Sequence, residues 1–228
     1  MIPYFADGQV TLYHGDCREV AEWLAADVLV TDPPYGIAWT RGKATRAGRA
    51  IANAQRHEGI ANDQDTSVRD AALALWGEGP SIVFGSFYAP QPPAVRHVGV
   101  WEKPLDSGIW GEPVGMRRDI EALWFAGRWP KRKNERGSVF RSGIRNVGNP
   151  SSPAGRYGHP HAKPVDLIEE LLALSPPGVI ADPFAGSGSI LVAARNLGRK
   201  AIGVEVDEQY CEQAALRLSQ MTLTAGAE

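Results

Sequence analysis

The chain has 228 residues, of which 43% are apolar and 22% are charged, and its formal net charge is -2. This size and composition predict one globular domain over residues 1–228 with a sizeable core, and the apolar runs are too short to cross a bilayer. No secretory signal stands at the start, and Cys17 and Cys211 form no metal- or disulfide-like pair, so we expect a cytoplasmic, metal-free protein.

The first half of the chain alternates short apolar runs with polar segments. Strands are expected over residues 9–13, 28–30, 81–85, 98–101 and 120–125. Helices are expected over residues 17–25 and 68–77. Residues 36–64 have no clean period and predict a long loop, a feature that is usually functional or disordered in a compact domain.

The second half alternates strictly between helices and strands. Apolar residues at helical spacing predict helices over 167–172, 190–197 and 207–218. Strands are expected over residues 179–181 and 201–204. Such alternation predicts a mostly parallel sheet with right-handed crossovers.

The positive charges gather in two stretches that are rich in Gly, Asn or Ser. The first contains Arg41, Lys43, Arg46, Arg49 and Arg56, and the second contains Arg128, Lys131, Arg132, Lys133, Arg136, Arg141, Arg145 and Arg156. One such run alone is more often a solvated loop. Two runs on either side of one active site favour a surface that contacts phosphates.

A glycine-rich turn follows the strand at 179–181. Asp182-Pro-Phe-Ala-Gly186-Ser-Gly188 stands where this strand passes into a helix, a place where backbone can approach a ligand and unpaired N–H groups face it. The spacing is not that of a dinucleotide-binding fingerprint. Glu205 ends the next strand, where an acid commonly binds ribose hydroxyls, although a surface carboxylate is the alternative.

A second chemical signal is the tetrapeptide Asp32-Pro33-Pro34-Tyr35 at another strand end. The two prolines stiffen the turn, so a carboxylate, a backbone carbonyl and an aromatic ring are held together. These groups suit an unpaired base with an exocyclic amine, which needs two acceptors and a stacking face. The common alternative is a proline turn with a packed tyrosine and no chemical role. The presence of the glycine-rich turn in the same chain argues against this alternative.

Together these motifs resemble those of the DNA amino-methyltransferases, which modify adenine N6 or cytosine N4. Asp32-Pro-Pro-Tyr35 is similar to their catalytic motif, and Asp182 to Gly188 is similar to their cofactor motif. The order, catalytic motif first, resembles the permuted β group, which implies that the first strand, near residues 10–13, lies beside the strand that ends at Glu205. Further matches are Gly15-Asp16, Trp101-Glu-Lys103, Arg117-Arg-Asp-Ile-Glu121, His159-Pro-His-Ala-Lys163-Pro and Gly203-Val-Glu205.

This resemblance implies a Rossmann-like fold with a mostly parallel seven-stranded sheet and helices on both faces. It implies S-adenosylmethionine as cofactor and double-stranded DNA as partner, and leaves a homodimer open. The cofactor residues that it implies are Asp16, Asp32, His159, Lys163, Asp182, Phe184, Ala185, Gly186, Ser187, Gly188 and Glu205. The basic residues expected on DNA are Arg41, Lys43, Arg46, Arg49, Arg132, Lys133 and Arg141.

The resemblance also implies how the reaction proceeds and where the target is read. The amine of a flipped-out base would attack directly, with Asp32, Pro33, Pro34 and Tyr35 as the catalytic turn. Residues 127–158 would form a short target-recognition region. Asp at position 32 favours adenine N6; cytosine N4, an RNA base and a catalytically silent DNA-binding module are the alternatives. C5 methylation is excluded because neither cysteine follows a proline.

Overall fold

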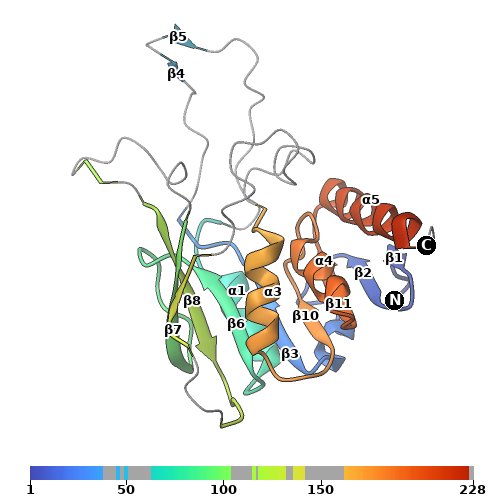
Figure 1. Cartoon of the computed structure of the whole chain (residues 1–228), viewed down its shortest axis with the longest axis horizontal. Coiled ribbons are helices and arrows are strands. Elements are labelled where there is room, and N and C mark those ends of the chain that lie inside the picture. Colours follow the sequence, from blue (N-terminus) through green and yellow to red (C-terminus); the bar gives the residue numbers. More distant parts are fainter. Residues whose placement is uncertain are drawn as a thin grey trace.

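The computed structural model describes residues 1–37, 63–103, 115–116, 118–131, 136–141 and 162–225, and the backbone of two short strands at 45–46 and 49–50. Side chains after residue 220 are not described. Within these parts, one large sheet is flanked by helices (Figure 1). Its nine strands are β1 (Phe5–Ala6), β2 (Val10–His14), β3 (Val28–Thr31), β6 (Ser81–Gly85), β7 (Val95–Glu102), β8 (Ile120–Ala126), β9 (Val139–Phe140), β10 (Ile180–Asp182) and β11 (Ala201–Glu205).

The strand order is β1-β2-β11-β10-β3-β6-β8-β7-β9. The central strands β2, β11, β10, β3 and β6 run parallel, whereas β8 is antiparallel to both β6 and β7. The mostly parallel sheet is therefore confirmed, but the expected count of seven strands is wrong. The two additional strands, β1 and β9, lie at the edges and have two residues each, too few to show a period in the sequence.

The pairing of β2 with β11 joins the beginning of the chain to its end. Five residue pairs, from Val10 opposite Ala201 to His14 opposite Glu205, lie in parallel register. This neighbourhood, expected for a permuted chain, is confirmed. It brings the residues that follow His14 to the same edge of the sheet as Glu205.

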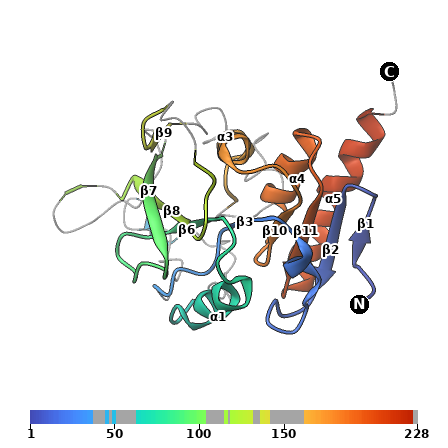
Figure 2. The ribbon, with the colours of Figure 1, turned by 90° about the horizontal axis from the view of Figure 1, so that it is seen from below.

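Helices cover both faces of the sheet, as expected (Figure 2). One face carries α3 (Val165–Leu174), α4 (Ser189–Asn196) and α5 (Glu208–Ala225), and the other carries α1 (Ser67–Trp76) and the 3-10 helix η1 (Glu22–Ala25). The strands alternate between the two faces. In β3, Val28 and Val30 pack under α3, whereas Leu29 packs with Trp23 of η1.

Two local predictions differ from the structure. The helix expected over residues 17–25 is reduced to η1, because the backbone turns at Asp16 and Trp23 donates its indole N–H to the Cys17 carbonyl at 2.9 Å. Within the predicted loop 36–64, the strands β4 (Thr45–Arg46) and β5 (Arg49–Ala50) pair antiparallel.

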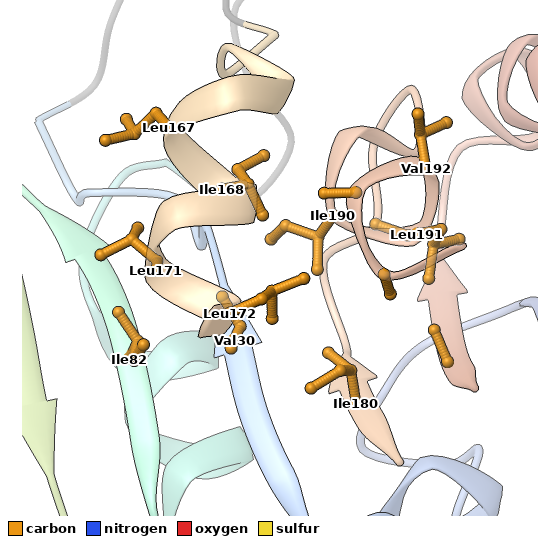
Figure 3. Close-up of a cluster of buried hydrophobic side chains, with 14 of the residues drawn as sticks. Val30, Ile82, Leu167, Ile168, Leu171, Leu172, Ile180, Ile190, Leu191 and Val192 are labelled. Carbon is orange, nitrogen blue, oxygen red and sulfur yellow. The ribbon is translucent and has the colours of Figure 1, made fainter. Parts of the chain in front are cut away.

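The main core lies between α3, α4 and the sheet (Figure 3). Its fully buried side chains include Leu167, Ile168, Leu171, Leu172, Ile180, Ile82 and Val30. The apolar spacing of α3 places its four residues on one face, against the strands. This packing fixes the positions of β3 and β10 relative to α3, and thereby the positions of the residues at their carboxyl ends.

None of the helices in the described part of the chain has the length and apolar character needed to span a bilayer.

Candidate active site at the carboxyl ends of the strands

Four parallel strands end at one edge of the sheet, and each delivers an acidic residue there. Asp32 follows β3, Asp182 ends β10, Glu205 ends β11 and Asp16 follows β2. Open α/β sheets bind ligands at this edge because the chain turns away from the sheet and leaves room between the strand ends. The sequence motifs singled out above therefore meet in space.

The glycine-rich turn, residues 182–188, is joined to the end of β11 by the carboxylate of Glu205. Gly186 and Gly188 have positive φ angles of 51° and 80°, and Gly188 is the N-cap of α4. The Gly186 N–H donates to Glu205 Oε2 at 2.7 Å, and the Asp207 N–H donates to Glu205 Oε1 at 2.8 Å. Burial raises the pKa of the Glu205 carboxyl, and these amide donors offset part of that rise.

Asp182 lies deeper in the same turn. Its Oδ1 accepts the Thr31 hydroxyl at 2.8 Å and the Phe184 N–H at 3.2 Å. Its Oδ2 is buried and has no hydrogen-bond partner among the described residues. Burial raises the pKa of Asp182 to about 7. A buried oxygen without a donor is costly unless a ligand supplies one.

These features fit a cofactor with a cationic end and a ribose. Asp182 has an unused buried acceptor, and the carboxylate of Glu205 keeps lone pairs beyond its two amide bonds. Asp16 stands beside Glu205 because the Gly15 N–H donates to the Glu205 carbonyl at 2.9 Å. The residues present therefore supply acceptors for the hydrogen-bond donors of S-adenosylmethionine, which are its ammonium group and its ribose hydroxyls.

The proline turn after β3 places its acid next to a phenol. The Tyr35 hydroxyl lies 2.8 Å from Asp32 Oδ1 and 3.1 Å from Glu121 Oε2. Burial raises the pKa of Asp32, and that of Tyr35 rises well above its ordinary value for the same reason and because both carboxylates face it. The side chain of Asp32 nevertheless keeps 23% of its surface exposed, so it can meet a ligand.

The turn is held in place from the other side of the long loop. The Gly36 N–H donates to the carboxylate of Asp63, a buried residue, at 2.8 Å. Gly36 has a φ of 70°, and a Cβ there would lie 2.7 Å from the backbone of Asp65. Sequence reasoning missed Asp63, because nothing in the sequence pairs residue 36 with the far end of the loop.

Lys163 joins the proline turn to a strand on the antiparallel side of the sheet. Its Nζ lies 2.9 Å from Asp32 Oδ2 and 3.2 Å from Glu121 Oε2. Glu121 Oε1 in turn pairs with Lys103 Nζ at 2.7 Å. We call Asp32, Tyr35, Glu121, Lys163 and Lys103 the charged cluster.

Electrostatics in the charged cluster favour the ionised forms of its central pair. Burial by itself would raise the pKa of Glu121, but Lys163 and Lys103 hold it below its ordinary value. Burial would lower the pKa of Lys163, and Asp32 and Glu121 outweigh this effect and raise it. Sequence reasoning gave Lys163 a cofactor contact and gave Glu121 and Lys103 no role. The W-x-K segment and the segment ending at Glu121 were the signals that could have found them.

The remaining predicted cofactor residues lie in or beside the glycine-rich turn. Phe184 and Ala185 pack into the two layers of core beneath it. Ser187 is buried, and its carbonyl accepts Arg217 of α5 at 2.7 Å. Asp16 forms an ion pair with Arg18, which holds the pKa of that carboxyl below its ordinary value.

Most of the predicted DNA contacts cannot be placed. Arg41, Lys43, Arg132 and Lys133 lie outside the described residues, as does His159, which was predicted to bind the cofactor. Arg46 and Arg49 are described only as backbone of β4 and β5, where they face each other in register. Arg141 is exposed and pairs with Glu102 at 3.0 Å.

Two further chemistries find no support in this part of the molecule. No group of metal-ligating side chains occurs among the described residues. Both cysteines are buried, and burial raises the pKa of each thiol to about 12. A thiol with so high a pKa is a poor nucleophile at neutral pH.

Comparison with known proteins finds related methyltransferases. A family model described as "DNA methylase", for N6 and N4 methyltransferases, matches residues 96–216. The chain is 39% identical to the type II methyltransferase M2.LlaDCHI of Lactococcus lactis subsp. cremoris, over 96% of this chain and 92% of that protein. It is 31% identical to the putative methylase YubD of Escherichia coli, over 93% and 92% of the two chains.

A solved structure supports the fold. The complex of M1.HpyAVI with S-adenosylmethionine has a TM-score of 0.57, with 22% identity, and the match covers 91% of this chain and 99% of that one. The nine-stranded sheet with helices on both faces is thus a methyltransferase fold.

Proposed function

We propose that this chain, which belongs to the N6/N4 family of DNA methylases, transfers a methyl group from S-adenosylmethionine to N6 of adenine in double-stranded DNA. One observation carries the proposal. A partly exposed carboxylate, Asp32, and the ring of Tyr35 stand at the strand edge beside a glycine-rich turn that fits the cofactor.

The residues of the proline turn would activate the target amine. An amine conjugated with a base ring is a weak nucleophile, and hydrogen bonds to the Asp32 carboxylate and the Pro33 carbonyl would direct its lone pair outward. The cofactor supplies an electrophilic methyl group when bound. Positioning and electrostatics would carry the rate, without a covalent enzyme intermediate. Because these groups cannot reach an amine inside a duplex, the base must flip out, and Tyr35 would stack on it.

The residues of the glycine-rich turn would bind the cofactor. Glu205 would accept the ribose hydroxyls, Asp182 and the amides up to Gly188 would meet its amino-acid part, and Asp16 would lie near its adenine. Phe184 would pack against it. His159 and Lys163 were expected at the amino-acid end as well; Lys163 contacts Asp32 and Glu121, which favours a role beside the target base instead.

Three finer features complete the proposal. Asp rather than Ser at position 32 favours adenine over cytosine. The catalytic motif precedes the cofactor motif, and β2 lies beside β11, as in the permuted β group. The whole chain would act as one methyltransferase domain. The basic region 127–158 would recognise the target sequence, and both basic stretches would bind DNA.

The decisive experiment expresses the chain in a methylation-free host and maps modified bases by long-read sequencing. N6-methyladenine in a defined sequence context is the expected result, and the Asp32→Ala variant, as the matched control, should leave the DNA unmodified. Detection of N4-methylcytosine instead would show that the target base is cytosine. Unmodified DNA together with intact DNA binding in vitro would leave only a silent binding module.

A further inference from the structure

The charged cluster contains one more carboxylate than the proposed reaction requires. Asp32 suffices to accept a hydrogen bond from the target amine. Glu121 lies on β8, which is separated from β3 by β6 in the sheet. Its side chain is 13% exposed, and both of its oxygens are bound by lysines. Burying charges costs free energy, so a buried carboxylate that the proposed reaction does not use needs an explanation.

Both carboxylate oxygens of Asp32 already have partners. In this structure its Oδ1 accepts from Tyr35, and its Oδ2 is paired with the Lys163 ammonium. An arriving amine would compete with a cation for the same oxygen. A carboxylate tied to an ammonium group is also a weaker acceptor for a neutral N–H. Either Lys163 must loosen its hold on Asp32, or the amine gains little from it.

The position of Lys163 offers a solution. Its ammonium lies between Asp32 and Glu121 at 2.9 and 3.2 Å, within hydrogen-bond reach of both. The rings of Tyr35 and Phe84 hold it there, with centroids at 5.3 and 5.4 Å. Lys163 can therefore strengthen one pairing as it weakens the other without leaving its place.

Lys103 keeps the second acceptor in position. Its Nζ binds Glu121 Oε1, and its own backbone N–H donates to the Asp119 carbonyl at 2.7 Å. Glu121 is thus fixed by the pairing of β7 with β8 and by a lysine on the side away from Lys163. With two acids and two lysines, the cluster can keep all four ionised without net charge.

We propose that Glu121, held by Lys103, is a positioning residue that takes the Lys163 ammonium when the target amine occupies Asp32, and so frees that carboxylate for the amine. This role rests on the proposed methyl transfer and deepens it. Glu121 touches neither the methyl group nor the amine in this scheme. Its effect on the reaction passes through Lys163.

The test compares Glu121→Gln with wild type in single-turnover methyl transfer to duplex DNA at saturating cofactor. The amide keeps the shape of Glu121 and removes its charge, so Lys163 stays on Asp32. The rate should fall by roughly tenfold to a hundredfold, the range expected when one charged hydrogen bond is lost. Affinity for S-adenosylmethionine, measured by calorimetry, should not change, and the rates are compared at a temperature at which thermal melting shows both proteins to be folded. Glu22→Gln, which removes the charge of a glutamate on η1 that pairs with the N-terminal ammonium group, is the matched control and should keep the wild-type rate.

A pH profile separates positioning from a purely structural role. The groups that act on Asp32 are Tyr35, Lys163, Glu121 and, from β10, Asp182, while Lys103 acts through Glu121. Glu121 raises the pKa of Asp32 and Lys163 lowers it. The acidic limb of the rate should therefore move to lower pH in Glu121→Gln and to higher pH in Lys163→Met. A change in folding alone would not move the acidic limb in opposite directions in the two variants.

A double variant completes the design. Because Glu121 acts through Lys163, adding Glu121→Gln to Lys163→Met should slow the reaction by less than Glu121→Gln does alone. Should Glu121→Gln fail to fold, the limb shift of Lys163→Met and the rate of Glu121→Asp decide the matter, with an intermediate rate expected for the latter. A wild-type rate and pH limb in Glu121→Gln, or full additivity in the double variant, would overturn this role while leaving methyl transfer intact. A wild-type enzyme that methylates no DNA would instead overturn the proposed function, and this role with it.

Discussion

The two halves of the active site are held together by different means. In the cofactor half, the Glu205 carboxylate is fixed by two backbone amides, that of Gly186 in the glycine-rich turn and that of Asp207 just after β11. In the transfer half, Asp32 is fixed by Tyr35 of the same turn and by Lys163 before α3, and both of these contact Glu121 of β8. A backbone amide is a rigid donor that no substitution except proline removes, whereas a lysine or tyrosine side chain can be deleted singly. The cofactor half should therefore tolerate change in its neighbours better than the transfer half.

The largest effect is expected at Asp32. Asp32→Ala should lower methyl transfer by about a hundred- to a thousandfold, because the loss of one preorganised group falls on the transition state. Affinity for the cofactor should largely survive, since the amides of the other half remain. Labelled methyl transfer to adenine-containing duplexes and calorimetry measure the two quantities. Near-normal turnover would end the proposed mechanism.

Glu205 should show the converse behaviour. Glu205→Ala should weaken S-adenosylmethionine binding by about 1.5–3 kcal/mol, the value of a hydrogen bond to a charged group. Glu205→Gln keeps one acceptor oxygen for an amide and serves as the milder control. Calorimetry with the cofactor alone provides the measurement, with thermal melting as the check on folding. An unchanged Kd in Glu205→Ala would remove this residue from the cofactor site.

Tyr35 tests whether the ring or the hydroxyl matters more in the transfer half. Tyr35→Ala should weaken capture of the flipped base by about 1–3 kcal/mol, the value of stacking one base, and leave some activity. Tyr35→Phe should be milder because it keeps the ring and loses only the bond to Asp32 or Glu121. The KM for duplex DNA is the quantity to compare. Equal defects in both variants would assign the effect to the hydroxyl.

The last test concerns the stability of the cofactor half and its dependence on pH. The pKa of Asp182 is about 7 in the folded chain, against an ordinary value of 3.8. Between these values the folded chain holds a proton that the unfolded chain has released, so stability contributed by this group falls as pH rises from about 4 to about 7. Asp182→Asn, which cannot ionise, should therefore gain in Tm relative to wild type at about pH 8 and gain little at about pH 4. A difference in Tm that is the same at both pH values would contradict the burial argument.

The two halves also differed in how far the sequence predicted them. The glycine-rich turn was recognisable because glycines at fixed spacing, a strand before them and an acid after the next strand are all local features. The proline turn was recognisable for the same reason. The residues that complete the charged cluster were missed. Glu121 lies on β8 and Lys103 directly follows β7, and although their segments resemble family segments, no local pattern places either residue beside Asp32.

The outline of the fold was predictable to a similar degree. Alternating helices and strands indicated the parallel sheet, and the motif order implied that β2 pairs with β11, which the register confirms. The edge strands β1 and β9 were not predicted, and the helix expected over residues 17–25 was overestimated. Short edge strands owe their form to a neighbour that is already folded, and η1 depends on the burial of Trp23 between two layers.

The sequence by itself determined the turns and their chemistry, because glycine and proline restrict or free the backbone wherever they stand. It also determined which strand ends carry acids. Only the tertiary structure decided that Lys163 lies between Asp32 and Glu121, because that contact requires the strand order, the register of β7 with β8 and the entry of the chain into α3 all at once. From the sequence alone, a charged side chain could pair with many others. Burying an unpaired charge costs free energy, so the fold favours the arrangement in which each buried charge has a partner of opposite sign.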